Sequence, residues 1–118
     1  GAGYVVTQMF FDNAYYFDFV EQCRSVGIDV PIIPGIKIIT RKRHLRSLPA
    51  HFHTDIPEAL AAEIEAAETN DEVKHLGIEW ALRQSEELLS AGVPCLHFYI
   101  MSSAKTVKEV VEPLRQMA

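Results

Sequence analysis

The chain has 118 residues, of which 48% are hydrophobic and 23% charged, so it suits one modest domain with a real core (residues 1–118) and excludes two. Its formal net charge of −5 argues against a nucleic-acid partner, because duplex-binding proteins usually carry a basic surplus. No apolar run of about 18 residues and no secretory signal occurs, which predicts a cytoplasmic protein without a membrane partner.

The first predicted element is a strand over residues 4–11, an apolar and β-branched run typical of a strand buried on both faces. Asp12 and Asn13 then offer a helix N-cap. Gly27 predicts the end of this helix, since glycine takes the left-handed C′ conformation without strain. One apolar helix face is defined by Tyr16, Phe19, Val20 and Cys23.

A second short strand is predicted over residues 30–34, closed by Gly35. Thr40 can cap a short basic helix over residues 41–48. Residues 49–57 have the composition of a loop, and a helix is predicted from about Asp55 to Ala67.

A longer helix follows, with a capping box at Thr69 and Glu72 and an end at Gly92. Its core-facing residues are Val73, Leu76, Gly77, Trp80, Ala81 and Leu88. The third strand covers residues 94–100, with Cys95 at its buried start, and both cysteines are predicted to be reduced and packed. The last helix has Val107, Val110, Val111 and Leu114 facing inward.

This alternation of strands and helices predicts a parallel sheet with right-handed crossovers. Three such strands form either a small open α/β unit or an arc of a larger closed barrel. The short joins before the second and third strands are typical of the αβ loops of a (β/α)₈ barrel. The chain begins on Gly1 and strand-like sequence follows almost at once, which is how an excised piece looks.

Ligands of parallel sheets bind at the carboxyl ends of the strands. Gln8 is the unusual residue there, because it is a polar amide inside an apolar strand. A buried amide needs polar partners, which could be a ligand, a neighbouring side chain or an ordered water.

Two further groups of residues carry charge or metal-ligating atoms. A basic cluster could meet a phosphate or carboxylate, or be a solvated helix face; it comprises Lys37, Arg41, Lys42, Arg43 and Arg46. A histidine group, formed by His44, His51 and His53 near Asp55, lacks a full tetrahedral set, so no metal site is predicted.

Five segments, in this order, resemble the last three strand–helix units of the methylenetetrahydrofolate reductase family. They are Val-Thr-Gln-Met-Phe-Phe-Asp (6–12), Val-Pro-Ile-Ile-Pro-Gly-Ile (30–36), Gly-Ile-Glu (77–79), Glu-Leu-Leu-Ser-Ala-Gly (87–92) and Leu-His-Phe-Tyr (96–99). The Leu-Pro-Ala-His-Phe-His segment (48–53) is similar to that of bacterial members. The resemblance implies an arc of a TIM (β/α)₈ barrel that binds FAD at its C-terminal face. It also implies reduction of 5,10-methylenetetrahydrofolate to 5-methyltetrahydrofolate with NADH or NADPH.

Site residues follow from the same resemblance. Gln8 matches a glutamine that hydrogen-bonds the folate pterin, and Tyr99 a tyrosine on the folate side of the pocket. Leu48 stands where the family has a bulky apolar contact to substrate or nicotinamide. His44, on the same predicted helix, is also expected to contact the substrate. Val6 matches a small contact with the flavin region, and no catalytic residue is predicted in this chain.

The chain also departs from the family. Ser103 stands where an arginine that contacts folate is common, so this positive contact is lost or falls to Lys105. The family's glutamate acid and most FAD contacts belong to upstream segments, so the chain alone is expected to be inactive. Unpaired strand edges predict a homo-oligomer. The alternative is a stand-alone α/β binding or interaction module.

Overall fold

The computed structural model describes residues 3–52, 54–99 and 104–117, and the side chains of 104–107 and 116–117 are outside this description. The elements are β1 (Val5–Met9), α1 (Asn13–Ser25), β2 (Ile32–Lys37), α2 (His44–Phe52), α3 (Glu58–Ala66), α4 (Asn70–Ser90), β3 (His97–Tyr99) and α5 (Ala104–Met117). The strands form one parallel sheet in the order β1-β2-β3, which confirms the predicted α/β architecture.

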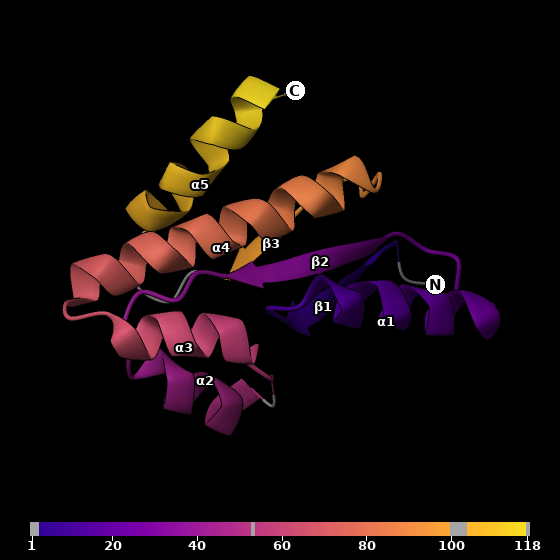
Figure 1. Cartoon of the computed structure of the whole chain (residues 1–118). Helices are drawn as coiled ribbons and strands as arrows, with labels where there is room; N and C mark the ends of the chain where they lie inside the picture. Colours follow the sequence, from indigo (N-terminus) through magenta and orange to yellow (C-terminus); the bar gives the residue numbers. More distant parts are fainter. Residues whose placement is uncertain (1–2, 53, 100–103, 118) are drawn as a thin grey trace.

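The arrangement of the helices is that of successive strand–helix units in an arc of a (β/α)₈ barrel. Helix α4 runs along the sheet and α5 packs against α4, while α2 and α3 lie beyond the arrowheads of β1 and β2 (Figure 1). The carboxyl ends of these strands therefore point toward the α2–α3 pair. No helix in the described part of the chain is long and apolar enough to span a bilayer.

Two apolar clusters hold the unit together. The first packs the sheet against the long helices and includes Tyr16 of α1, Ile32 and Ile36 of β2, Ala81 and Leu88 of α4, and Val110 and Leu114 of α5. The second fills the space between the strand ends and α2, α3 and α4, and includes Met9, Leu48, Leu60, Ile64 and Val73. Alternation along the strands explains the first cluster: Val5 and Ile32 face it, so Val6 and Ile33 lie on the opposite face of the sheet.

The helix ends follow the predicted capping chemistry. Asp12 accepts a hydrogen bond from the Ala14 N–H at 2.9 Å and caps α1. Thr69 accepts from the Glu72 N–H at 3.2 Å at the start of α4. Gly27 and Gly92 have φ values of 87° and 94°, as the predicted left-handed stops require.

The predicted boundaries of α2 are wrong at both ends. Residues 41–43 form turns before the helix, and α2 then continues through Pro49 and His51 to Phe52, where a loop was expected. Leu45, Leu48 and Phe52 all pack in the second cluster, and this burial outweighs the hydrogen bond that Pro49 cannot donate. Thr40 does not cap the helix with its side chain; its backbone N–H instead donates to His44 Nδ1 at 3.2 Å.

The strand predictions also need correction. β2 runs from Ile32 to Lys37, past the predicted stop at Gly35, because Gly35 pairs with both neighbouring strands. β1 covers Val5–Met9 rather than residues 4–11, and it is not buried on both faces, because its Gln8 is exposed. β3 begins at His97, which leaves Cys95 exposed before it, whereas Cys23 packs against the first cluster as predicted.

Candidate functional site

A cavity of about 330 Å³ lies at the carboxyl end of β1. Gln8, Met9 and the β1–α1 turn form one side, and Thr54 and Asp55 from the segment after α2 form another. Thr54 Oγ1 donates to the Met9 carbonyl at 3.1 Å, so this segment is fixed to the end of β1. The cavity therefore lies where ligands of parallel sheets are expected.

Gln8 presents a polar amide at this cavity. Its Nε2 donates to the Phe52 carbonyl at 3.3 Å, and this is its one side-chain hydrogen bond within the described part of the chain. The side chain is exposed, so the second N–H and the amide oxygen remain available. Such a group can donate to and accept from the edge of a heterocycle.

Tyr99 crosses the sheet to reach the strand that carries Gln8. Its hydroxyl donates to the Thr7 carbonyl at 2.6 Å, although β2 lies between β1 and β3. The crossing depends on Gly35: a Cβ there would lie 2.5 Å from the Tyr99 ring and 2.7 Å from the Thr7 oxygen. Thr7 Oγ1 also accepts the Gly35 N–H at 3.0 Å. The structure thus brings Gln8 and Tyr99 to one end of the sheet.

Lys37 lies beside Tyr99, and its charge acts on the nearby His44. Lys37 pairs with Tyr99 across the sheet, and its residue surface is only 4% exposed, so burial lowers the pKa of its ammonium group. Burial, followed by the charges of Lys37, Arg43 and Arg41, lowers the pKa of His44 to about 4. His44 is therefore neutral near pH 7, with Nδ1 accepting from Thr40, which leaves the proton on Nε2.

The other predicted contacts lie in different surroundings. Leu48 is 1% exposed and packs in the second apolar cluster together with Tyr99, so its side chain lies in the core and not at the surface of the site. Val6 is half-buried and pairs with Ile33 on the sheet face opposite the long helices.

Several sequence-based expectations fall outside the described part of the chain. These are His53, Ser103 and the side chains of Lys105 and Val107. In the part that is described, no group of three or more His, Cys, Asp or Glu residues is placed to hold a metal ion.

Lys37 is the residue that sequence reasoning assigned wrongly. It was grouped with a surface patch of basic residues, but β2 carries it into a buried position. The available signal was the same as for Gln8: Lys37 interrupts the apolar run from Ile36 to Ile39. A lysine in such a run is rarely buried without a functional or structural partner.

The sequence matches known proteins along nearly its whole length. A family model described as methylenetetrahydrofolate reductase matches residues 1–115. "Methylenetetrahydrofolate reductase (NADH) 1" of Arabidopsis thaliana is 36% identical over 107 residues, which are 90% of this chain and 18% of that protein. "Probable methylenetetrahydrofolate reductase (NADPH)" of Caenorhabditis elegans is 31% identical over 116 residues, or 97% of this chain and 18% of that protein.

A bacterial relative and a solved structure extend the comparison. "5,10-methylenetetrahydrofolate reductase" of Salmonella typhimurium (strain LT2) is 32% identical over 106 residues, covering 89% of this chain and 36% of that protein. The chain therefore spans only about a fifth to a third of these relatives. An uncharacterized protein from Clostridium thermocellum, described as binding two copies of 5-methyl-5,6,7,8-tetrahydrofolic acid, superposes with a TM-score of 0.60 at 16% identity. That match covers 99% of this chain and 43% of the other, and it shows a shared fold.

Proposed function

Because the chain belongs to the methylenetetrahydrofolate reductase family, we propose that it forms the folate-orienting arc of such an enzyme. The whole protein would reduce 5,10-methylenetetrahydrofolate to 5-methyltetrahydrofolate with NADH or NADPH, using FAD. The names of the relatives include both nicotinamide nucleotides, and the solved neighbour is described as a folate-binding protein. In this proposal residues 1–118 are the C-terminal part of a TIM barrel.

The observation that carries the proposal is the exposed amide of Gln8 at the cavity on β1. A pterin edge offers both N–H donors and ring-nitrogen or carbonyl acceptors, and a carboxamide can pair with both kinds. The bond to the Phe52 carbonyl uses one N–H and fixes the direction of the amide. Gln8 therefore suits an orienting role rather than proton transfer.

Tyr99, His44 and Leu48 support this orientation in different ways. The Tyr99 hydroxyl is committed to the Thr7 carbonyl, so the ring is held against the strand that carries Gln8, although it does not line the Gln8 cavity itself. His44 can donate from Nε2 while Nδ1 holds the Thr40 N–H. Leu48 packs in the same cluster as Tyr99 and supports the site without reaching the surface.

The residues present fit only one part of FAD. Val6 and Ile33 form a half-buried apolar patch on the open sheet face, which suits the edge of a flat aromatic ring. When bound, FAD supplies the hydride-transfer chemistry between the nicotinamide and the folate. No glycine-rich phosphate loop occurs in the sequence, so the remaining contacts and the acid would come from other parts of the protein, and this chain alone would be inactive.

The test is the Gln8→Ala substitution in the full-length protein, with the two half-reactions measured separately by stopped-flow absorbance. Folate reduction should slow by about tenfold or more, since one or two hydrogen bonds of roughly 1–3 kcal/mol are lost. Flavin reduction by NADH or NADPH should change little. The matched control is Gln22→Ala, which removes an exposed glutamine of α1. Equal losses in both half-reactions would contradict an orienting role for Gln8.

A further inference from the structure

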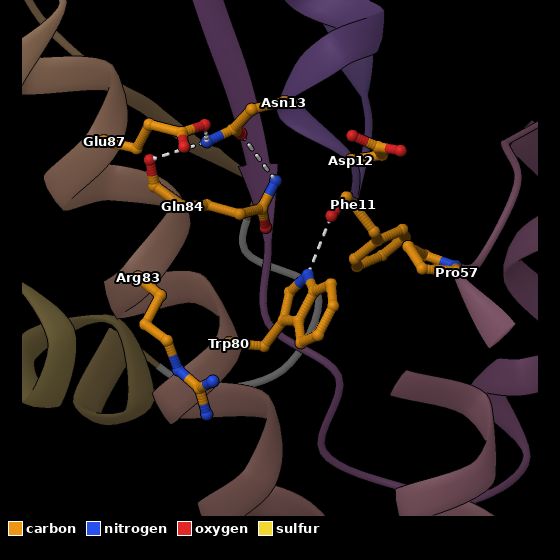
Figure 2. Close-up of a pocket in the computed structure, with 8 residues that line it drawn as sticks. All are labelled: Phe11, Asp12, Asn13, Pro57, Trp80, Arg83, Gln84 and Glu87. Atoms are coloured by element: carbon orange, nitrogen blue, oxygen red, sulfur yellow. Dashed lines mark hydrogen bonds between the residues drawn. The ribbon is translucent and has the colours of Figure 1, made fainter. Parts of the chain in front are cut away.

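A second cavity, of about 340 Å³, lies between the β1–α1 turn and α4 (Figure 2). Its walls come from that turn, from Pro57 at the start of α3 and from one face of α4. It shares Phe11 and Asp12 with the Gln8 cavity but contains none of the residues proposed to contact folate. The family resemblance assigns nothing to this site.

A buried amide network forms the floor of this cavity. Gln84 Nε2 donates to the Phe10 carbonyl at 3.1 Å and to Asn13 Oδ1 at 3.2 Å. Asn13 Nδ2 donates to the backbone carbonyl of Gln84 at 3.1 Å and to Glu87 Oε1 at 2.8 Å. Both N–H groups of Gln84 are therefore used, and the orientation of its amide is determined.

This orientation leaves one acceptor without a partner. Gln84 is 5% exposed, and its Oε1 is buried without a hydrogen bond to any described residue. Buried polar atoms are rarely left unpaired, so this oxygen requires a donor that the described chain does not supply. A ligand with an N–H group would supply one by displacing the side chains that now cover this oxygen at the cavity floor.

The charges around the cavity select the kind of donor. Glu87 has one carboxylate oxygen bonded to Asn13, and Asp12 has one bonded to the Ala14 N–H, so each has a second oxygen available. The one basic side chain, Arg83, is 64% exposed and pairs loosely with Glu79 at 3.8 Å. Oxygen acceptors and negative charge therefore dominate the interior of the cavity.

The shape of the cavity adds a preference for a flat ligand. Trp80 Nε1 donates to the Phe11 carbonyl at 2.7 Å, which fixes the indole ring as one wall, and the Phe11 side chain lies beside Pro57 (Figure 2). Indole faces attract cations, and most strongly those that stack. We propose that this cavity binds a small planar organic cation with N–H donors, of the amidinium or guanidinium class.

The experiment uses benzamidinium as the probe. The purified protein is titrated by isothermal calorimetry at constant ionic strength, and the emission of Trp80 is isolated by difference from a Trp80→Phe variant. Saturable binding with a change in Trp80 emission is expected, with weaker binding of neutral benzamide and no binding of benzoate. Preferential binding of benzoate would show an anion site at Arg83 instead, and absence of saturable binding would show that water alone fills the cavity. Either result overturns the proposal.

Two substitutions at exposed positions test the location of the cation without disturbing the buried network. Glu87→Gln keeps an oxygen for Asn13 but removes the charge, and should weaken benzamidinium binding about threefold. Arg83→Gln removes the competing positive charge and should strengthen binding about threefold. Glu21→Gln, an equivalent charge change on the exposed surface of α1, should leave the affinity unchanged. Equal effects of Glu87→Gln and Glu21→Gln would place the cation elsewhere.

Discussion

His44 makes a hydrogen bond that only its neutral ring can accept, because Nδ1 receives the Thr40 N–H. Its pKa of about 4 lies below the value of about 6.5 expected in an unfolded chain. Between these two values the unfolded state binds more protons than the folded state. The contribution of His44 to stability is therefore complete above about pH 6.5 and is lost progressively as the pH falls toward 4.

We predict that His44→Asn reduces this pH dependence, because the asparagine oxygen can accept the same N–H but does not titrate. Urea unfolding at pH 7 and pH 4.5 should show a smaller loss of unfolding free energy for the variant than for the parent protein. His75→Asn, which removes an exposed histidine of α4, is the matched control and should retain the parent's pH dependence. A parallel loss in the parent and in His44→Asn would mean that His44 is protonated in the folded state.

Gln8 and Lys37 show how far single residues could be interpreted from sequence. Both interrupt apolar strands, yet only Gln8 was recognised, because it lies in the middle of a clear strand pattern. Lys37 was not recognised because Gly35 suggests the end of the strand, so Lys37 was not expected to lie in β2. Gly35 instead lies within β2, where its lack of a side chain allows Tyr99 to cross the sheet. A contact between residues 92 positions apart leaves no local signal in the sequence.

At the scale of the elements, Gly77 is where α4 comes very close to the segment that leaves β2. A Cβ at this position would overlap the carbonyl group of Ile39, in the segment that leaves β2. The contact is with backbone, so no side-chain rotation can relieve it. Gly77 therefore sets the distance between the longest helix and the sheet.

We predict that Gly77→Ala destabilises the protein by about 3 kcal/mol, although alanine is the better helix former. Thermal or urea unfolding measures the change. Gly3→Ala is the matched control, since a Cβ at Gly3 meets nothing within 4 Å. Unchanged or increased stability of Gly77→Ala would mean that α4 can move away from β2 at little cost.

The helix ends that depend on capping residues close in sequence were predicted correctly, whereas the extent of α2, which depends on tertiary contacts, was not. Asp12, Thr69, Gly27 and Gly92 mark their helix ends by chemistry that operates within a few residues. In α2, Pro49 predicts a break, but Leu48 and Phe52 are held in a cluster with residues from α3, α4 and β1. Such a cluster can only be recognised once the fold is known.

At the scale of the whole molecule, the sheet is open. In the described part of the chain, β1 and β3 each have one unpaired edge, and the face with Val6 and Ile33 has no helix of the first cluster on it. Exposed strand edges favour pairing with another chain. Covering a few hundred Å² of apolar surface would contribute several kcal/mol before the cost of association.

We predict that the 118 residues prepared alone form a homodimer or higher oligomer, which sedimentation velocity at micromolar concentration measures. Val6→Lys should shift the equilibrium toward monomer, because it places a charge on the open face. Val26→Lys, at a position already 74% exposed in the connection after α1, should have no effect. A monomeric parent chain would show that the helices protect the sheet more fully than its edges suggest.

The hydrogen bond from Tyr99 to the Thr7 carbonyl has a consequence for the order in which the protein matures. During synthesis, β1, α1 and β2 leave the ribosome well before residue 99, so the Thr7 carbonyl is present early without the tyrosine that donates to it. Contacts between residues so distant in sequence form late, because closing the long intervening loop costs chain entropy first. The sheet is thus completed only after β3 has been translated, and a nascent chain that stalls before β3 would carry Gln8 on two paired strands without the Tyr99 hydrogen bond.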